Sequence, residues 1–150
     1  MTAALDHARH FLGLGIREFG RVPNDGPPSL LFMRGDKLPW CAGFVLTCLQ
    51  MADVEDLDYW TSRNVQAFED RSKRKSKWYD PHQPPTPGDV VFFRARGSSD
   101  EGTGRHCGLV NRVTDTGEIH TIEGNVGDKI GEKCYNSTDS RITGFARWDP

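Results

Sequence analysis

The residues of this chain best suited to nucleophilic chemistry are its four cysteines, and Cys41 has the most informative context among them. It lies in the segment PWCAGFV, and the apolar spacing that follows predicts a buried helix beginning near Cys41. A helix N-terminus lowers the pKa of a thiol and offers free N–H groups to an oxyanion. Cys41 is therefore a candidate nucleophile, with a buried structural thiol as an equal alternative from position alone. Cys48, two turns deeper among apolar residues, is expected to pack in the core.

A thiol nucleophile needs a base, and the chain offers five histidines. Three of them are expected at surface or loop positions, namely His7, His10 and His82. His106 begins a predicted strand directly after a Gly/Ser-rich segment, residues 96–104, where its side chain can reach a cleft at the end of a sheet. His120 lies inside a later predicted strand, EIHTIEGN.

Strand alternation separates the last two histidines, because successive side chains of a strand point to opposite faces. In EIHTIEGN, Glu123 and Asn125 share one face, and His120 lies on the other. Such a polar pair can hold the second ring nitrogen of a catalytic histidine on a neighbouring strand. The economical catalytic set is Cys41, His106 and Glu123, with Asn125 as a second polar partner. A plain strand end before the turn GNVGD is an equally weighted alternative for Glu123 and Asn125.

The first half of the chain is predicted to be helical and must carry the cysteine. A helix from Thr2 to Gly20 is indicated by an apolar stripe formed by Leu5, Ala8, Leu12, Ile16 and Phe19. A short helix follows near residues 30–32, then the buried helix from Cys41, then a more exposed helix over 61–77 that ends in the basic run RSKRKSK. That run is interpreted as a solvated helix end, with docking of an anionic polymer as the less favoured alternative.

The second half of the chain is predicted to form the sheet that carries the histidine and the carboxylate. Four prolines in PHQPPTPGD exclude a helix there and mark the connection between the two halves. Strand-like segments follow at DVVFFR, CGLVNRV, EIHTIEG, KIGEKCY and ITGFARW. Helices followed by antiparallel strands predict an α+β fold.

Length and composition limit the classes of function. With 150 residues and 16.8 kDa, a single domain over residues 1–150 is expected. The net charge of -2 and the pI of about 6.2 exclude a broadly basic domain that binds nucleic acid. Because no apolar stretch is long enough for a signal peptide or a membrane span, we expect synthesis in the cytoplasm and no membrane insertion. We also expect a monomer, and four cysteines without a CxxC pair do not make a disulfide scaffold.

Four sequence motifs, taken in order, resemble one family. PWCAGFV opens a helix, GDVVFF opens the sheet, a His-x-Gly sequence starts a strand at His106, and IEGN ends the next one. Together they resemble the CHAP amidohydrolase/peptidase domains, papain-like cysteine hydrolases that cleave amide bonds in bacterial peptidoglycan. The resemblance extends from Asn24 to Arg147 and implies N-terminal helices packed on an antiparallel sheet of five or six strands. The catalytic residues that it implies are Cys41, His106, Glu123 and Asn125.

The resemblance also implies a mechanism, which is acyl transfer from peptidoglycan to Cys41 through a thioester, with His106 as acid and base. Trp40, Trp78 and Tyr79 are candidate substrate-binding residues, and simple packing is an alternative for each. The resemblance does not decide whether the bond cut is that of an amidase or of an endopeptidase. It also leaves two routes to the cell wall open, a phage endolysin that acts after lysis and non-classical delivery. The alternative functions are an NlpC-type endopeptidase and a catalytically inactive wall-binding or interaction module on the same fold.

The sequence differs from that of many CHAP domains in two respects, the residues expected at the oxyanion hole and the residues available to bind a metal. The sequence KLPW stands where many of them have a Gln before the Cys, so backbone N–H groups at the helix start are expected to hold the oxyanion. Asn24, Asp25 and Asp36 are too few oxygen ligands for a calcium cage, so no metal and no cofactor is expected. A zinc site is disfavoured because typical ligand spacing is missing among its candidate ligands, Cys41, His106, Cys107 and His120.

Overall fold

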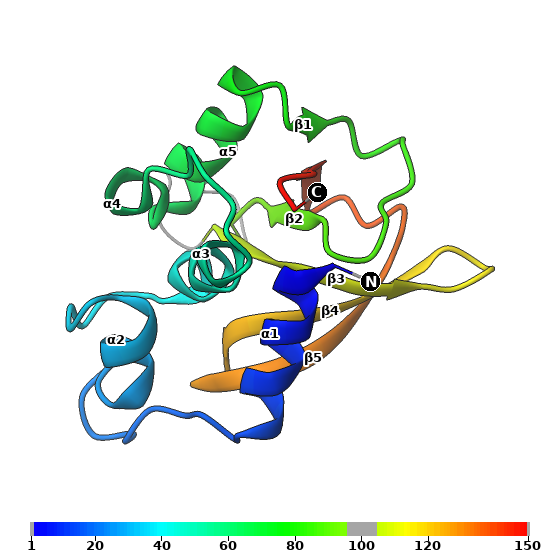
Figure 1. Cartoon of the computed structure of the whole chain (residues 1–150). Helices are drawn as coiled ribbons and strands as arrows, with labels where there is room; N and C mark the ends of the chain where they lie inside the picture. The colour runs from blue at the N-terminus through cyan, green and yellow to red at the C-terminus, as the bar shows by residue number, and fades with distance from the viewer. Residues whose placement is uncertain (1, 96–104, 150) are drawn as a thin grey trace.

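The computed structural model describes residues 2–95 and 105–149 and shows helices packed against one antiparallel sheet (Figure 1). Within these residues the helices are α1 (Ala3–Gly13), α2 (Pro27–Phe32), α3 (Cys41–Met51), α4 (Tyr59–Ser62) and α5 (Val65–Arg74). The strands are β1 (Trp78–Tyr79), β2 (Val90–Phe93), β3 (His106–Val113), β4 (Glu118–Val126), β5 (Lys129–Asn136) and β6 (Ile142–Ala146). The six strands lie in the order β1-β6-β2-β3-β4-β5. This architecture confirms the predicted α+β fold, and the predicted Gly/Ser-rich segment 96–104 lies outside the described residues.

Helix α3 is the centre of the fold because its sequence, CAGFVLTCLQM, is apolar on almost every side. It packs on β3 and β4 and against α1 and α2. Gly43 permits the close approach of α2, since a Cβ at this position would lie 2.4 Å from the carbonyl oxygen of Phe32. The predicted buried helix beginning at Cys41 is confirmed, and Cys48 is fully buried in the core. This burial fixes the start of α3, and with it Cys41, against the sheet.

The helix predicted over residues 2–20 is wrong in its second half, because α1 ends at Gly13. Gly15 adopts a left-handed backbone with φ of 67°, which a continuing helix cannot accommodate. The chain then runs beside β5, where Arg17 forms an isolated antiparallel bridge. Phe19, which the apolar spacing placed on the buried stripe, is 70% exposed. The prediction from apolar spacing alone therefore placed the end of this helix too late, beyond Gly15.

The exposed helix predicted over residues 61–77 is divided into α4 and α5. Asn64 starts α5 as its N-cap, since its side chain accepts a hydrogen bond of 3.1 Å from the backbone N–H of Ala67. Val65 and Phe68 are buried, as predicted. The chain leaves α5 through the short strand β1, which pairs with β6 and was not predicted.

The two faces of the sheet carry two apolar clusters, and β4 contributes to both. Ile122 packs with the helices, whereas Ile119 belongs to the cluster on the other face. The alternation is regular as far as Glu123, where the register against β5 shifts. Asn125, just beyond this shift, has a left-handed backbone with φ of 60°.

Among the described residues no helix is both long and apolar enough to cross a membrane.

Candidate active site

Cys41 is the first residue of α3, so its thiol lies at the positive end of a buried helix. The preceding residue, Trp40, is fully buried and anchors the helix start. Its ring stacks on Phe32 at a centroid distance of 5.7 Å, and its Nε1–H donates a 2.9 Å hydrogen bond to Glu18. The first N–H groups of a helix have no carbonyl partner within that helix, so they are available near Cys41.

His106 and Glu123 form a short polar contact beside Cys41. Nε2 of His106 lies 2.6 Å from Oε1 of Glu123, which is fully buried. The carboxylate also accepts hydrogen bonds from Thr121 Oγ1 at 2.5 Å and from the Tyr135 hydroxyl at 3.1 Å. Three donors therefore satisfy a carboxylate that burial would otherwise destabilise.

Gly108 makes room for this contact. Glu123 extends across β3, and a Cβ at Gly108 would lie only 2.6 Å from the Cγ of Glu123. Any side chain at this position would therefore displace Glu123 from His106. This steric requirement explains why a glycine occupies the last position of the His-x-Gly sequence.

His106 shifts the pKa values of Glu123 and Cys41 toward their charged forms, and both groups shift the pKa of His106 in the same sense. Burial lowers the pKa of His106, but its contacts with Cys41 and Glu123 outweigh this effect and raise the pKa to about 10. Burial raises the pKa of Glu123, and the hydrogen bond and charge of His106 reverse this, so that it stays below its ordinary value. A hydrogen bond from Cys107, together with the contact with His106, holds the pKa of Cys41 well below its ordinary value despite burial. A thiolate paired with an imidazolium is therefore favoured near neutral pH.

Cys107 is the neighbour of Cys41 that the sequence analysis did not assign to the site. It follows His106 on β3, is fully buried, and burial raises its pKa well above the ordinary value. Cys107 therefore keeps its proton and donates a hydrogen bond to the Cys41 sulfur. Strand alternation does place Cys107 on the helix-facing side, but the position of α3 is needed to bring it to Cys41.

One open cavity of about 490 Å³, here called the thiol cavity, brings together the four predicted catalytic residues Cys41, His106, Glu123 and Asn125. The other residues that line it are Pro39, Phe93, Arg94, Arg105, Val126, Gly127, Lys133, Tyr135 and Arg141. Among the described residues, Nε2 of His106 contacts the carboxylate of Glu123 on β4 and not the amide of Asn125. The register shift in β4 explains this, because it removes Asn125 from the alternation that was expected to align it with the carboxylate.

Cationic side chains dominate the wall of the thiol cavity. Arg94, Lys133 and Arg141 line it, whereas Glu123 is the one carboxylate among the described lining residues. Arg141 also lies over the ring of Tyr135, with 5.5 Å between the guanidinium carbon and the ring centroid. The thiol cavity therefore suits a ligand that carries negative charge.

A family model described as CHAP domain matches residues 33–125, which is more than half of the chain. The chain belongs to the CHAP domain family. Among solved structures, it is similar to an N-acetylmuramoyl-L-alanine amidase from Staphylococcus aureus, with 18% sequence identity and a TM-score of 0.45. That match covers 74% of this CHAP chain and 32% of the amidase, so the chain spans about a third of the amidase's length. No curated protein matches the sequence.

The three aromatic residues expected to bind substrate do not line the thiol cavity of this CHAP domain. Trp40 is fully buried behind the helix start. Trp78 donates its Nε1–H to Glu69, and the Tyr79 hydroxyl donates to Asp89. Packing, which was the alternative for each of them, describes their positions.

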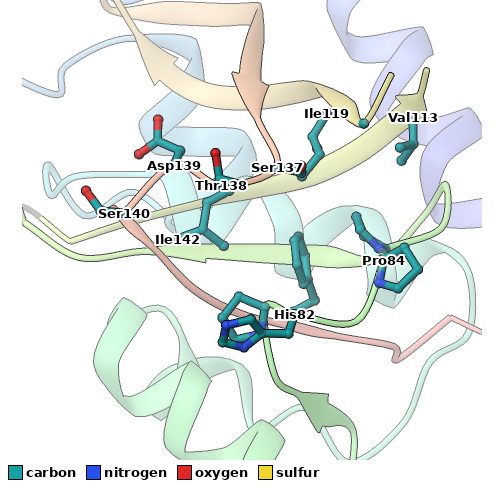
Figure 2. Close-up of a pocket in the computed structure, with 13 residues that line it drawn as sticks. His82, Pro84, Val113, Ile119, Ser137, Thr138, Asp139, Ser140 and Ile142 are labelled. Atoms are coloured by element: carbon teal, nitrogen blue, oxygen red, sulfur yellow. The ribbon is translucent and has the colours of Figure 1, made fainter. Parts of the chain in front are cut away.

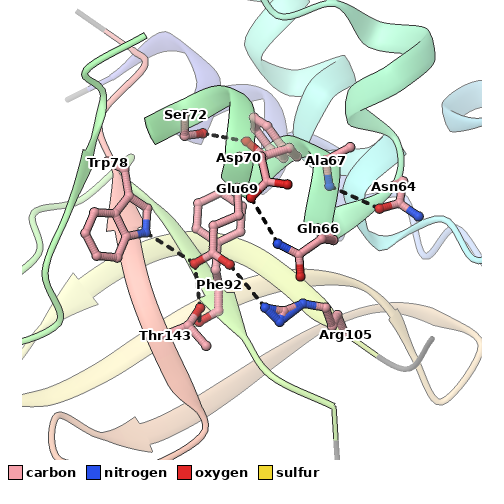
Figure 3. Close-up of polar contacts among 11 residues, drawn as sticks. Asn64, Gln66, Ala67, Glu69, Asp70, Ser72, Trp78, Phe92, Arg105 and Thr143 are labelled. Atoms are coloured by element: carbon pink, nitrogen blue, oxygen red, sulfur yellow. Dashed lines mark hydrogen bonds and ion pairs between the residues drawn. The ribbon is translucent and has the colours of Figure 1, made fainter. Parts of the chain in front are cut away.

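A buried carboxylate holds the start of the strand that carries His106 (Figure 3). Glu69 of α5 lies 3.3 Å from the guanidinium of Arg105 through Oε1. Its Oε2 accepts hydrogen bonds from Trp78 Nε1 at 3.2 Å and from Thr143 Oγ1 at 2.7 Å. Because Arg105 immediately precedes His106, these contacts fix the beginning of β3 in the CHAP domain relative to α5 and β6.

Of the four residues considered for a zinc site from the sequence, Cys41, His106 and Cys107 lie together, and His120 lies apart from them. His120 lies across β4 from Glu123, and its Nε2 is 3.7 Å from the sulfur of Cys134 on β5. It is therefore separated from Cys41 and His106, which line the thiol cavity without it.

A second cavity of about 490 Å³, here called the proline cavity, lies between the proline-rich connection and the turn before β6 (Figure 2). Its lining residues are Pro81, His82, Pro84, Pro85, Val113, Gly117, Ile119, Ser137, Thr138, Asp139, Ser140, Ile142 and Phe145. His82 is the histidine of this cavity, and its side chain is 92% exposed. No cysteine occurs among the described residues that line it.

Proposed function

We propose that this CHAP domain is a cysteine hydrolase that cleaves amide bonds of bacterial peptidoglycan through a thioester on Cys41. The observation that carries this proposal is the placement of His106 between Cys41 and the buried carboxylate of Glu123, with the pKa of the thiol lowered. Family membership supports hydrolysis of amides in peptidoglycan, and the activated thiol supports the nucleophile.

The proposed reaction begins with the Cys41 thiolate and the His106 imidazolium. The thiolate attacks the amide carbonyl, and N–H groups of the first turn of α3 stabilise the oxyanion. His106 donates its proton to the leaving amine as the C–N bond breaks, which leaves a thioester on Cys41. Neutral His106 then takes a proton from water, the hydroxide attacks the thioester, and collapse of the intermediate releases a carboxylate and restores the ion pair.

Glu123 acts on this sequence through His106. Its hydrogen bond occupies Nε2, which leaves Nδ1 for Cys41. The carboxylate therefore selects the orientation of the ring and stabilises the imidazolium, as the acidic member of a catalytic triad does. Thr121 and Tyr135 position the carboxylate in turn.

The cationic wall of the thiol cavity favours a substrate with carboxylate groups near the bond that is cut. Stem peptides of peptidoglycan carry free carboxylates, whereas the glycan backbone is mostly neutral. We infer that Lys133 and Arg141 bind such a carboxylate and that the peptide, more than the sugar, occupies the cavity.

The test is mass spectrometry of fragments released from purified peptidoglycan by the wild type, by Cys41→Ala and by Cys48→Ala. The last is the matched control, because it removes a thiol from the same helix outside the cavity. Release by the wild type and Cys48→Ala, and none by Cys41→Ala, is expected. Equal release by Cys41→Ala would exclude Cys41 as the nucleophile, and new reducing sugar ends without new amines would exclude amide hydrolysis.

The same fragments identify the bond. A free lactyl carboxylate on the sugar together with a free amine on the first stem residue identifies an amidase. New amines within the stem peptide or the cross-bridge identify an endopeptidase.

A further inference from the structure

Three side chains with metal-binding donor atoms meet at the β5 end of the sheet, outside the thiol cavity. Glu118 and His120 are two residues apart on β4, so they project from the same face of that strand. Cys134 on β5 lies directly opposite His120 in the antiparallel ladder. One ligand atom from each of the three residues lies within 4.8 Å of the other two. The register of two adjacent strands therefore builds this cluster.

The distances within the cluster match those around a tetrahedral zinc ion. The sulfur of Cys134 lies 3.2 Å from Oε2 of Glu118 and 3.7 Å from Nε2 of His120. Zinc bonds of about 2.3 Å to sulfur and about 2.0–2.1 Å to nitrogen or oxygen place such donor pairs roughly 3.5 Å apart. The two observed distances lie on either side of this value, so an ion fits with small side-chain movements.

We propose that Glu118, His120 and Cys134 form a zinc site whose fourth position is open to water. A thiolate and an imidazole favour zinc over calcium or magnesium, which prefer oxygen ligands only. The thiolate and the carboxylate together neutralise the charge of a divalent ion. Cys134 and Glu118 are exposed, so an ion can reach them from solvent.

Arg112 is a cationic side chain that faces this cluster. It lies opposite His120 on β3 and interacts electrostatically with Cys134. Because Arg112 is exposed, its long side chain can extend into solvent when an ion binds. The site therefore does not require a cation to be buried beside the metal.

The zinc site lies across β4 from the hydrolytic residues. Thr121, which follows His120, points the other way and donates its hydroxyl hydrogen to Glu123. A bound ion would therefore join β4 to β5 without entering the thiol cavity. Its expected effect is on the stability of the sheet, since an ion that binds only the folded chain raises the unfolding temperature.

The site is tested on the full chain with Zn²⁺ by equilibrium dialysis, and with Co²⁺ by its thiolate charge-transfer absorption. One ion per chain is expected for the wild type, with the cobalt–thiolate band present. Cys134→Ser should remove the band and one bound ion, and Glu118→Gln and His120→Asn should each weaken binding at least about tenfold. Zinc should raise the unfolding temperature of the wild type and leave that of Cys134→Ser unchanged.

Cys41→Ala separates this site from the thiol cavity, which also holds sulfur and nitrogen donors. The proposal requires that Cys41→Ala keep the cobalt–thiolate band. Loss of the band in Cys41→Ala and its persistence in Cys134→Ser would overturn the proposal, as would one ion per two chains in a zinc-dependent dimer. Circular dichroism of Cys134→Ser without metal shows whether the variant is folded, and Cys134→Ala serves as a second variant if it is not.

Discussion

The thiol cavity and the proline cavity have the same volume, about 490 Å³, but their polar groups are arranged differently. In the thiol cavity, His106 is held between a thiol and a buried carboxylate. In the proline cavity, His82 is almost fully exposed, and its partner Asp80 lies beside it in the same loop. The two cavities therefore differ in the linkage and burial of their titratable groups and not in volume, and this difference is the reason the proposed hydrolysis is assigned to the thiol cavity.

Replacing the two histidines tests this comparison with the largest expected effect. His106→Gln should lower kcat/KM for peptidoglycan hydrolysis by roughly 10³–10⁴-fold, because it removes the acid and base. His82→Gln should change kcat/KM by less than about twofold, since exposed side chains outside the site have small effects. Release of soluble fragments from labelled cell walls measures both. A loss in His82→Gln comparable to that in His106→Gln would remove the distinction between the two cavities.

Glu123→Gln tests whether the buried carboxylate makes the difference between the two histidines. We expect a decrease in kcat that is smaller than that of His106→Gln, because the imidazolium loses its anionic partner but the acid and base remains. The active form needs protonated His106, so wild-type activity should fall as the pH rises through about 10. In Glu123→Gln this alkaline limb should move to lower pH, because the charge that raises the pKa of His106 is gone. An alkaline limb that does not move, measured in a pH–rate profile of kcat/KM, contradicts the proposed link.

Cys107→Ala tests the second hydrogen bond to the nucleophile. Its removal should raise the pKa of Cys41 and shift the acidic limb of the pH–rate profile to higher pH, with a loss of up to about tenfold at pH 6. Cys107→Ser keeps a donor at the same position and should restore most of the activity. Equal activity of the alanine variant and the wild type across the acidic limb would show that Cys107 only packs there.

The smallest effects are expected from the walls of the two cavities. Lys133→Ala should raise KM about two- to fivefold with little change in kcat, because it removes an exposed charge that attracts substrate carboxylates. Thr138→Ala, the control in the proline cavity, should leave both constants unchanged. If KM of Lys133→Ala no longer depends on salt concentration, this supports the assignment of Lys133 to the binding of substrate carboxylates. An unchanged KM would contradict that assignment.

The positions of Cys41, His106 and Glu123 could be predicted because each depends on a local pattern. A helix start, a strand start and strand alternation are all set by residues close in sequence. Trp40 was misassigned for the opposite reason. Its place behind the helix start depends on Phe32 and Glu18, and nothing near it in the sequence indicates that burial.

Other parts of the site required information that spacing does not contain. Tyr135 reaches Glu123 through the register of β4 with β5, which no single strand specifies. Thr121 did share the predicted face of Glu123, so alternation could have assigned it to the site. A left-handed backbone interrupts the regular pattern in two places, at Asn125, where it ends the expected alternation with Glu123, and at Gly15, beyond which the predicted helix does not continue.

Gly108 also limits how this sequence can evolve. Since a Cβ there would collide with the Cγ of Glu123, most substitutions at position 108 would be tolerated only after Glu123 had been shortened or lost. A relative that has abandoned hydrolysis is released from this coupling, and a relative that retains it is not. A library randomised at both positions together, and selected for wall degradation, should therefore return the Gly–Glu pair, whereas selection for folding alone should return many combinations.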